Sequence, residues 1–193
     1  MNKGNYLTTL LRSRKTVFSL KDIALLWHET STNATSVRLN YYVNKGELYR
    51  IRKGLYAKDK NYNRYELATR ILTPAYVSFE IILVNAGVIF QFYEPIFLAS
   101  YTTRKIFVDQ QYYHFQKIKN EVLLNGIGIK HENETSFATK ERALLDTLYL
   151  NKNYYFDNLD AINWDFVFEI LPIYENKRLT KKVSFLRHQV ESK

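Results

Sequence analysis

Residues 44–58 read NKGELYRIRKGLYAK, and this stretch predicts a short β-hairpin. Apolar residues alternate with Arg50 and Arg52, which is the two-residue period of a strand. Lys53-Gly54 is typical of a tight turn, and the apolar Leu-Tyr-Ala that follows forms the returning strand. Three cations at and beside the turn are compatible with a hairpin that is exposed to solvent and with a hairpin that lies along a polyanion. The rest of the sequence bears on that choice.

Three short helical patterns precede the hairpin. Leucines within residues 7–11 form a first apolar stripe. Ser19 and Asp22 then predict a capping box at the start of a second helix, in which each side chain satisfies a backbone amide of the other. A third helix is predicted from about Asn33 to Lys45, where the following glycine ends it. Three helices followed by a basic hairpin are typical of a winged helix-turn-helix, a DNA-binding module.

The candidate DNA contacts follow from this prediction. A winged helix places the second helix of its motif in the major groove, where short polar side chains and arginine can meet base edges. The cations of the hairpin are expected to lie against phosphates, and Lys21 is expected to contact the DNA backbone. The expected contacts are Asn33, Thr35, Ser36, Arg38, Tyr41 and Lys45 in the helix, and Arg50, Arg52 and Lys53 in the hairpin.

The charge distribution supports a polyanionic partner. Residues 1–60 hold 12 of the 28 Lys and Arg but only four of the 19 Asp and Glu, a net charge of +8, and the remaining residues carry +1. Such an asymmetry is typical of a nucleic-acid-binding module joined to a neutral domain. A basic surface that meets only solvent, or a winged helix that docks onto protein, remains the alternative interpretation.

From residue 61 the pattern changes to mixed helices and strands. We predict an α+β protein in which a winged helix over residues 1–60 is followed by a mixed α+β domain over residues 61–193 with a helical C-terminal end. The expected helices cover 65–72, 78–86, 139–148, 164–171 and 179–190, and the expected strands cover 96–101, 105–108, 112–118, 127–131 and 135–138.

Four segments occur in an order that resembles a known family. They are KGELYRIRKGLYA, ELATRI, TPAYVSFEIILVNAGV and FATKERALLDTLYL. Together they resemble the AbiEi family, the antitoxins and transcriptional regulators of type IV toxin–antitoxin systems, over about residues 5–150. The resemblance implies an N-terminal domain that represses its own operon at inverted repeats in double-stranded DNA. It also implies a C-terminal domain that opposes a nucleotidyltransferase toxin. Because only two helical runs follow Leu150, a regulator without a toxin is the alternative.

The residues that could carry catalysis are scattered. The chain has no cysteine, and its four histidines show no metal-ligand spacing. A nuclease would need clustered carboxylates, and its best candidates, Asp165 and Glu175-Asn176-Lys177, lie at predicted helix ends instead of on adjacent strands. We therefore predict no enzyme, no metal and no cofactor.

Two further expectations concern location and the second domain. No secretory signal begins the sequence, and the longest apolar run, Ile81 to Tyr93, is too short to span a bilayer. A cytoplasmic protein is expected. Arg142 and Asp146 are spaced i, i+4 on one predicted helix, so they either brace that helix against the sheet or form part of a surface that faces a toxin.

Overall fold

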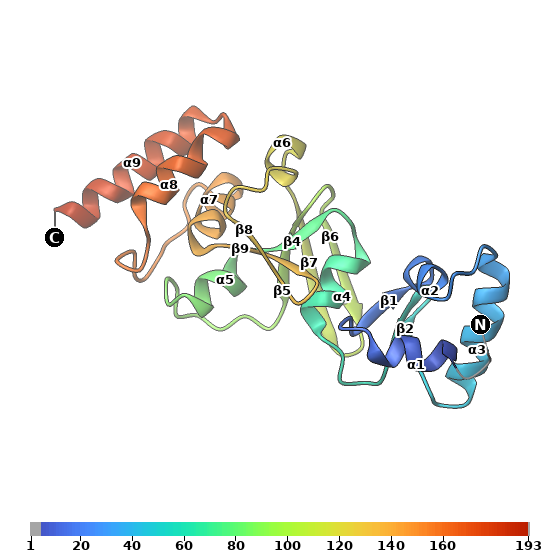
Figure 1. The fold of residues 1–193 in the computed structure, drawn as a ribbon. Coiled ribbons are helices and arrows are strands. Elements are labelled where there is room, and N and C mark those ends of the chain that lie inside the picture. Colours follow the sequence, from blue (N-terminus) through green and yellow to red (C-terminus); the bar gives the residue numbers. More distant parts are fainter. Residues whose placement is uncertain (1–4, 193) are drawn as a thin grey trace. The chain divides into compact units, whose positions relative to one another are not determined.

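The computed structural model describes residues 5–192 and divides the chain into two compact units. The first ends at Arg70 and the second begins at Ile71. Both contain helices and strands, so the predicted α+β class is confirmed (Figure 1). No helix of the described residues combines the length and the apolar character needed to cross a membrane.

The first unit contains four helices and three strands among its described residues. In chain order these are α1 (Asn5–Arg12), β1 (Val17–Ser19), α2 (Leu20–Leu26), α3 (Thr32–Asn44), β2 (Tyr49–Arg52), β3 (Leu55–Ala57) and α4 (Arg64–Ile71). The three strands form an antiparallel sheet in the order β1-β3-β2. The hairpin predicted around Gly54 is therefore confirmed. Strand β1 was not predicted, because three residues are too few to show a period.

The core of the first unit is built by apolar faces of its helices. Leu10 of α1, Ile23 of α2 and Leu39 of α3 are fully buried, and Trp27 packs with them. The predicted capping box fixes the start of α2. The Asp22 amide donates to Ser19 Oγ at 3.1 Å, and Asp22 Oδ2 accepts from the Ser19 amide at 2.9 Å. Such a cap contributes about 1 kcal/mol to helix stability.

Helix α4 packs with the first unit, so the boundary lies ten residues later than the predicted residue 60. The cause is a buried carboxylate. Glu66 is 1% exposed, and its Oε2 accepts from the Thr16 amide at 2.8 Å and from the Thr16 hydroxyl at 2.6 Å. Arg70, one turn later, donates to Asp22 Oδ2 at 2.8 Å. These contacts join residues about fifty positions apart, and no local sequence pattern predicts them.

The second unit is a six-stranded mixed sheet with helices. The strands are β4 (Ala75–Val77), β5 (Ile96–Ser100), β6 (Arg104–Val108), β7 (Gln111–Lys117), β8 (Ile129–Glu132) and β9 (Thr135–Ala138). Their order is β6-β7-β5-β4-β9-β8, with β5/β7 and β4/β9 parallel and the other neighbours antiparallel. The helices are α5 (Glu80–Asn85), α6 (Asn120–Leu123), α7 (Lys140–Leu150), α8 (Trp164–Ile170), a 3-10 turn at Leu171–Tyr174 and α9 (Lys177–Glu191). The five predicted strands are confirmed, and β4 was missed.

Arg142 and Asp146 lie on α7 inside the second unit, and both side chains are fully buried. Arg142 donates to the carbonyl oxygens of Val122 and Ile127 at 2.6 and 2.7 Å. Asp146 accepts from the hydroxyls of Tyr174, Ser78 and Tyr76 at 2.6, 2.7 and 3.0 Å. The prediction that this pair braces the helix is confirmed. The alternative, a surface that faces a toxin, is wrong for these two residues because neither reaches solvent.

Candidate nucleic-acid interface

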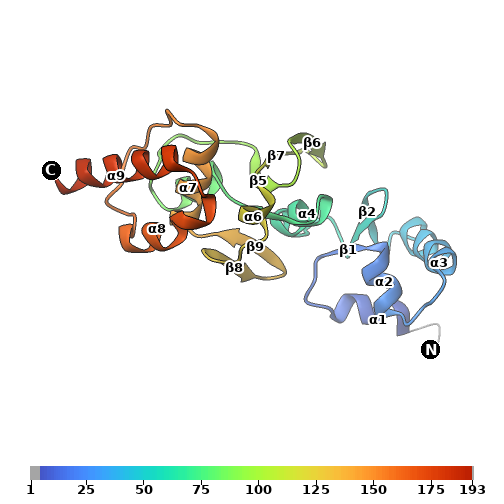
Figure 2. The same ribbon diagram turned by 90° about the horizontal axis from the view of Figure 1, so that it is seen from above.

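Helix α3 is the element expected to meet DNA, and it presents two distinct faces. Its N-cap is Ser31, whose side chain accepts from the Ala34 amide, so the helix begins one residue before the predicted start. It packs beside α2 (Figure 2). The inner face buries Thr35, Leu39 and Tyr42. We call the exposed residues on the opposite side the outer face; they are Asn33, Val37, Asn40, Tyr41 and Asn44.

Four of the predicted helix residues lie on this outer face or at its margin. Asn33 is exposed at the first turn and Tyr41 is 52% exposed. Lys45 is the exposed C-cap residue, and its ammonium lies 4.7 Å from the centroid of the Tyr41 ring. Ser36 is half-buried. The structure therefore leaves these four within reach of a ligand on the outer side of α3.

Thr35 requires a correction, because it lies on the inner face and not on a surface. Its side chain is fully buried. The hydroxyl donates to the Ser31 carbonyl at 3.0 Å, so burial leaves no unpaired polar group. A threonine in this position stabilises the helix start and cannot reach a base edge.

Arg38 lies at the flank of α3 and not on its outer face, and it already has partners within the first unit. Its guanidinium donates to Glu29 Oε1, and its central carbon lies 3.9 Å above the Tyr6 ring. Tyr6 donates to the same carboxylate oxygen at 3.2 Å. The hydrogen bond from Arg38 lowers the pKa of Glu29, so the pair is charged at neutral pH. Contact with guanine through Nη1 would require Arg38 to leave Glu29.

The hairpin places its cations as the sequence predicts. Along β2 the burial alternates, and Arg50 and Arg52 are the exposed residues. Lys53 is exposed at the turn, followed by Gly54 with φ +83°. None of the three cations forms an ion pair with any residue from 5 to 192. Strand β3, the antiparallel partner of β2 in the hairpin, is buried along its length.

Lys21 is exposed on the first turn of α2. Its neighbour Asp22 is half-buried and bound by Lys15 and Arg70, at 3.0 and 2.8 Å. Burial acts to raise the pKa of Asp22, but hydrogen bonds from Ser19 and Lys15 outweigh it, so the pKa is lowered. Lys21 therefore remains available to a phosphate, whereas Asp22 is held inside the unit.

Three outer-face residues were missed by the sequence prediction. Val37, Asn40 and Asn44 continue the exposed line that begins at Asn33. Their spacing of four, three and four residues is that of one helical face, so a full helical projection of residues 33–44 would have found them. The sequence prediction instead named Arg38, the residue after Val37, as the DNA contact. A single residue step rotates the side chain by about 100°.

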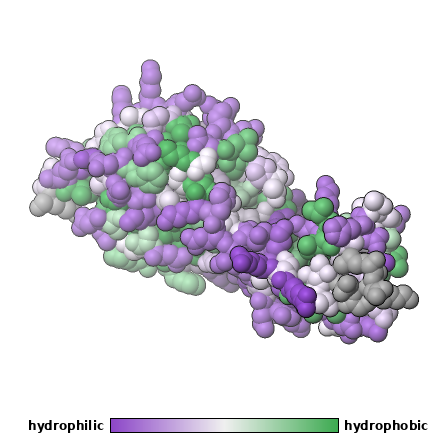
Figure 3. All heavy atoms as spheres, viewed as in Figure 1, coloured by the Kyte–Doolittle hydropathy of each residue, from purple (hydrophilic) through white to green (hydrophobic). Residues whose placement is uncertain are grey.

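A hollow of about 730 Å³ adjoins this helix on the side of Arg38. Its walls are mostly aromatic and aliphatic, and hydrophobic residues reach the surface of both units in patches (Figure 3). Val37 is 72% exposed at its margin. The hollow is lined by Tyr6, Ala34, Val37, Arg38, Tyr41, Tyr42 and Glu47.

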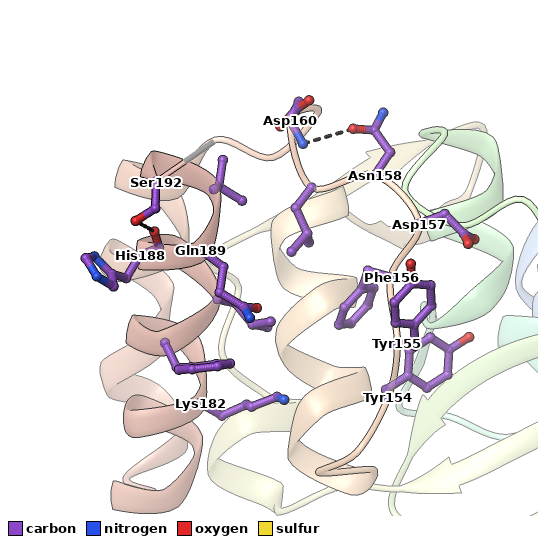
Figure 4. A pocket seen from close by; sticks show the side chains of 14 residues that line it. Tyr154, Tyr155, Phe156, Asp157, Asn158, Asp160, Lys182, His188, Gln189 and Ser192 are labelled. Atoms are coloured by element: carbon purple, nitrogen blue, oxygen red, sulfur yellow. Dashed lines mark hydrogen bonds between the residues drawn. The ribbon is translucent and has the colours of Figure 1, made fainter.

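A second hollow, of about 650 Å³, lies in the second unit between α9 and residues 154–160 (Figure 4). Asp157 at its wall accepts from the Phe90 amide at 2.8 Å, and the Asp160 amide donates to the Asn158 side chain at 3.0 Å. These polar groups hold the loop. Among residues 5–192 no three His, Cys, Asp or Glu side chains cluster as metal ligands do.

The carboxylates considered for a nuclease each form an ion pair with a different cation. Asp165 is bound by Arg187 at 3.3 Å, and Glu175 is bound by Lys119 at 3.0 Å. Each carboxylate therefore has its own cation. The interface on α3 and the hairpin is the stronger candidate, because the three hairpin cations and the carboxamides of α3 are exposed and have no ion pair or hydrogen bond with residues 5–192.

Comparison with known proteins adds no assignment. No protein-family model matches the chain, and no curated protein matches it, so the resemblance to the AbiEi family stays a prediction.

Proposed function

We propose that the chain is a sequence-specific DNA-binding transcriptional repressor and that its first unit is a winged helix-turn-helix. The observation that carries the proposal is the order α1-β1-α2-α3-β2-β3 with the strands arranged β1-β3-β2. In such a module α2 and α3 form the helix-turn-helix and the β2–β3 hairpin is the wing. The exposed cations of that hairpin, which form no ion pair with residues 5–192, are its expected phosphate contacts.

The dimensions and chemistry of α3 suit the major groove. A helix with side chains is about 10–12 Å across, close to the roughly 12 Å width of that groove. The outer face carries carboxamides and one aliphatic side chain, which are groups that meet base edges. Arg50, Arg52 and Lys53 would supply the sequence-independent affinity from the wing.

Binding is tested with the full chain on duplex DNA from the region upstream of its own gene. Replacing Arg50, Arg52 and Lys53 together by alanine is expected to abolish the gel shift at physiological salt. The matched control replaces Lys130, Lys152 and Lys181, three exposed lysines of the second unit, and removes the same charge. The control is expected to bind as the unaltered chain does. Equal loss in both variants would show that only net charge matters and would overturn the interface.

An antitoxin role for the second unit is proposed from the sequence resemblance. The full chain is expected to restore growth of cells that express a nucleotidyltransferase encoded beside it. The triple hairpin variant is expected to restore growth equally, because its changes lie in the first unit. Growth arrest that persists with the full chain would favour the alternative, a DNA-binding regulator without a toxin.

A further inference from the structure

None of the five outer-face residues of α3 is a cation, and this limits which bases they can recognise; the exposed C-cap residue Lys45 lies beyond them at the end of the helix. Arg38 is the only charged residue within α3, and it lies at the flank on Glu29 and Tyr6. The outer face instead presents the carboxamides of Asn33, Asn40 and Asn44. The structure gives none of them a hydrogen-bond partner among residues 5–192.

Val37 lies between Asn33 and Asn40 on the same face and is 72% exposed. From Asn33 to Asn40 the helix advances seven residues, or about 10 Å along its axis. That length corresponds to about three base pairs. The outer face of α3 thus has one aliphatic side chain between two carboxamides, and together they match a short segment of the major groove.

Each of these groups has a preferred base. A carboxamide can donate to adenine N7 and accept from adenine N6, and a methyl group packs against the C5-methyl of thymine. Guanine is recognised mainly by arginine or lysine, which are absent from this face. We propose that α3 recognises an A·T-rich segment, with Asn33 and Asn40 on adenine and Val37 on a thymine methyl. This inference rests on the proposed function and adds the base preference.

The preference is tested by selecting duplexes from a random library with the full chain. The enriched core is expected to be A·T-rich. On the selected duplex, replacing adenine by 7-deazaadenine removes the N7 acceptor, and replacing thymine by uracil removes the methyl group. A complete bidentate amide–adenine pair contributes about 5- to 150-fold in affinity, so losing its N7 hydrogen bond is expected to weaken binding by part of that factor, and losing the methyl group by less.

Variants assign each contact to its residue. Asn40→Ala is expected to reduce the difference in affinity between adenine and 7-deazaadenine duplexes to the part that Asn33 contributes, and Val37→Ala is expected to bind thymine and uracil duplexes more nearly equally. Arg38→Gln is expected to leave the selected core unchanged. Both readouts are ratios within one variant, so a partial loss of stability does not mimic them.

The outcomes separate this inference from the proposed function. Enrichment of a G·C core that Arg38→Gln abolishes would overturn the A·T proposal while leaving DNA binding intact. Binding that depends on the hairpin but enriches no core would overturn both the A·T proposal and the sequence specificity of the proposed repressor. Failure to bind any duplex at low salt would overturn the proposed function itself.

Discussion

Replacing Arg142 by methionine tests whether the buried network holds α7 in place. The guanidinium is fully buried and donates to two backbone carbonyls and to the Tyr76 hydroxyl at 3.1 Å. Methionine fills similar space but donates nothing, so the carbonyls lose their partner and the Asp146 carboxylate loses its cation. Removing one member of a buried ion pair costs about 3–5 kcal/mol.

The geometry favours the lower part of that range. Arg142 Nε lies 3.5 Å from Asp146 Oδ1 and has no hydrogen-bond partner among the described residues, so the direct contact is weak. Asp146 also keeps three hydroxyl donors when Arg142 is removed. We therefore expect the free energy of unfolding of the second unit to fall by about 3 kcal/mol.

Fluorine NMR of the full chain labelled with fluorotryptophan measures this change in a urea titration. The two tryptophans, Trp27 and Trp164, lie in different units, so each unit has its own resonance. The matched control is Arg187→Met, which breaks two ion pairs at the surface, with Glu191 at i, i+4 and with Asp165. Surface pairs contribute little. Equal shifts of the Trp164 transition in both variants would refute the account of the buried network.

Three smaller changes test the first unit. Asp22→Asn is expected to lower the free energy of unfolding by about 1 kcal/mol at neutral pH. Because the pKa of Asp22 is lowered in the folded state, this cost should disappear as the pH falls below about 3.9, the usual pKa of an aspartate, and through the folded-state pKa. Urea titrations at several pH values measure it. Gly54→Val is expected to weaken DNA binding more than Gly54→Asn, since φ is +83° and asparagine tolerates that region; equal affinities in gel shifts would contradict the strained turn. Thr35→Ala is expected to lower the melting temperature without changing the selected DNA core, and a changed core would restore Thr35 as a contact.

Local signals explain which parts of the fold could be predicted. Ser19 and Asp22 lie three residues apart, so their capping box can be predicted from a single helical turn of sequence. The strands β5 to β9 also follow from short apolar runs. The partners of Arg38 come instead from α1 and from the loop after α2, and Glu66 is bound by Thr16. Such contacts depend on how the helices pack, which a local sequence pattern does not show.

The same limit explains the errors at the candidate interface. A helical pattern gives the direction of a side chain, but it does not say which flank a neighbouring helix covers. Thr35 was expected at the surface because it is polar, yet a hydroxyl that donates to the preceding turn can be buried at little cost. The hairpin cations were placed correctly because strand alternation leaves only two faces.

The central claim is that the hairpin cations lie on DNA phosphates, and the salt dependence of binding tests it most directly. Fluorescence anisotropy of the full chain on one duplex, at several salt concentrations, gives the slope of log affinity against log salt. Lys53→Ala is expected to flatten this slope by about 0.9, the value for one phosphate contact, while Asn40→Ala leaves it unchanged. A slope that Lys53→Ala leaves as steep as that of the unaltered chain would contradict the account.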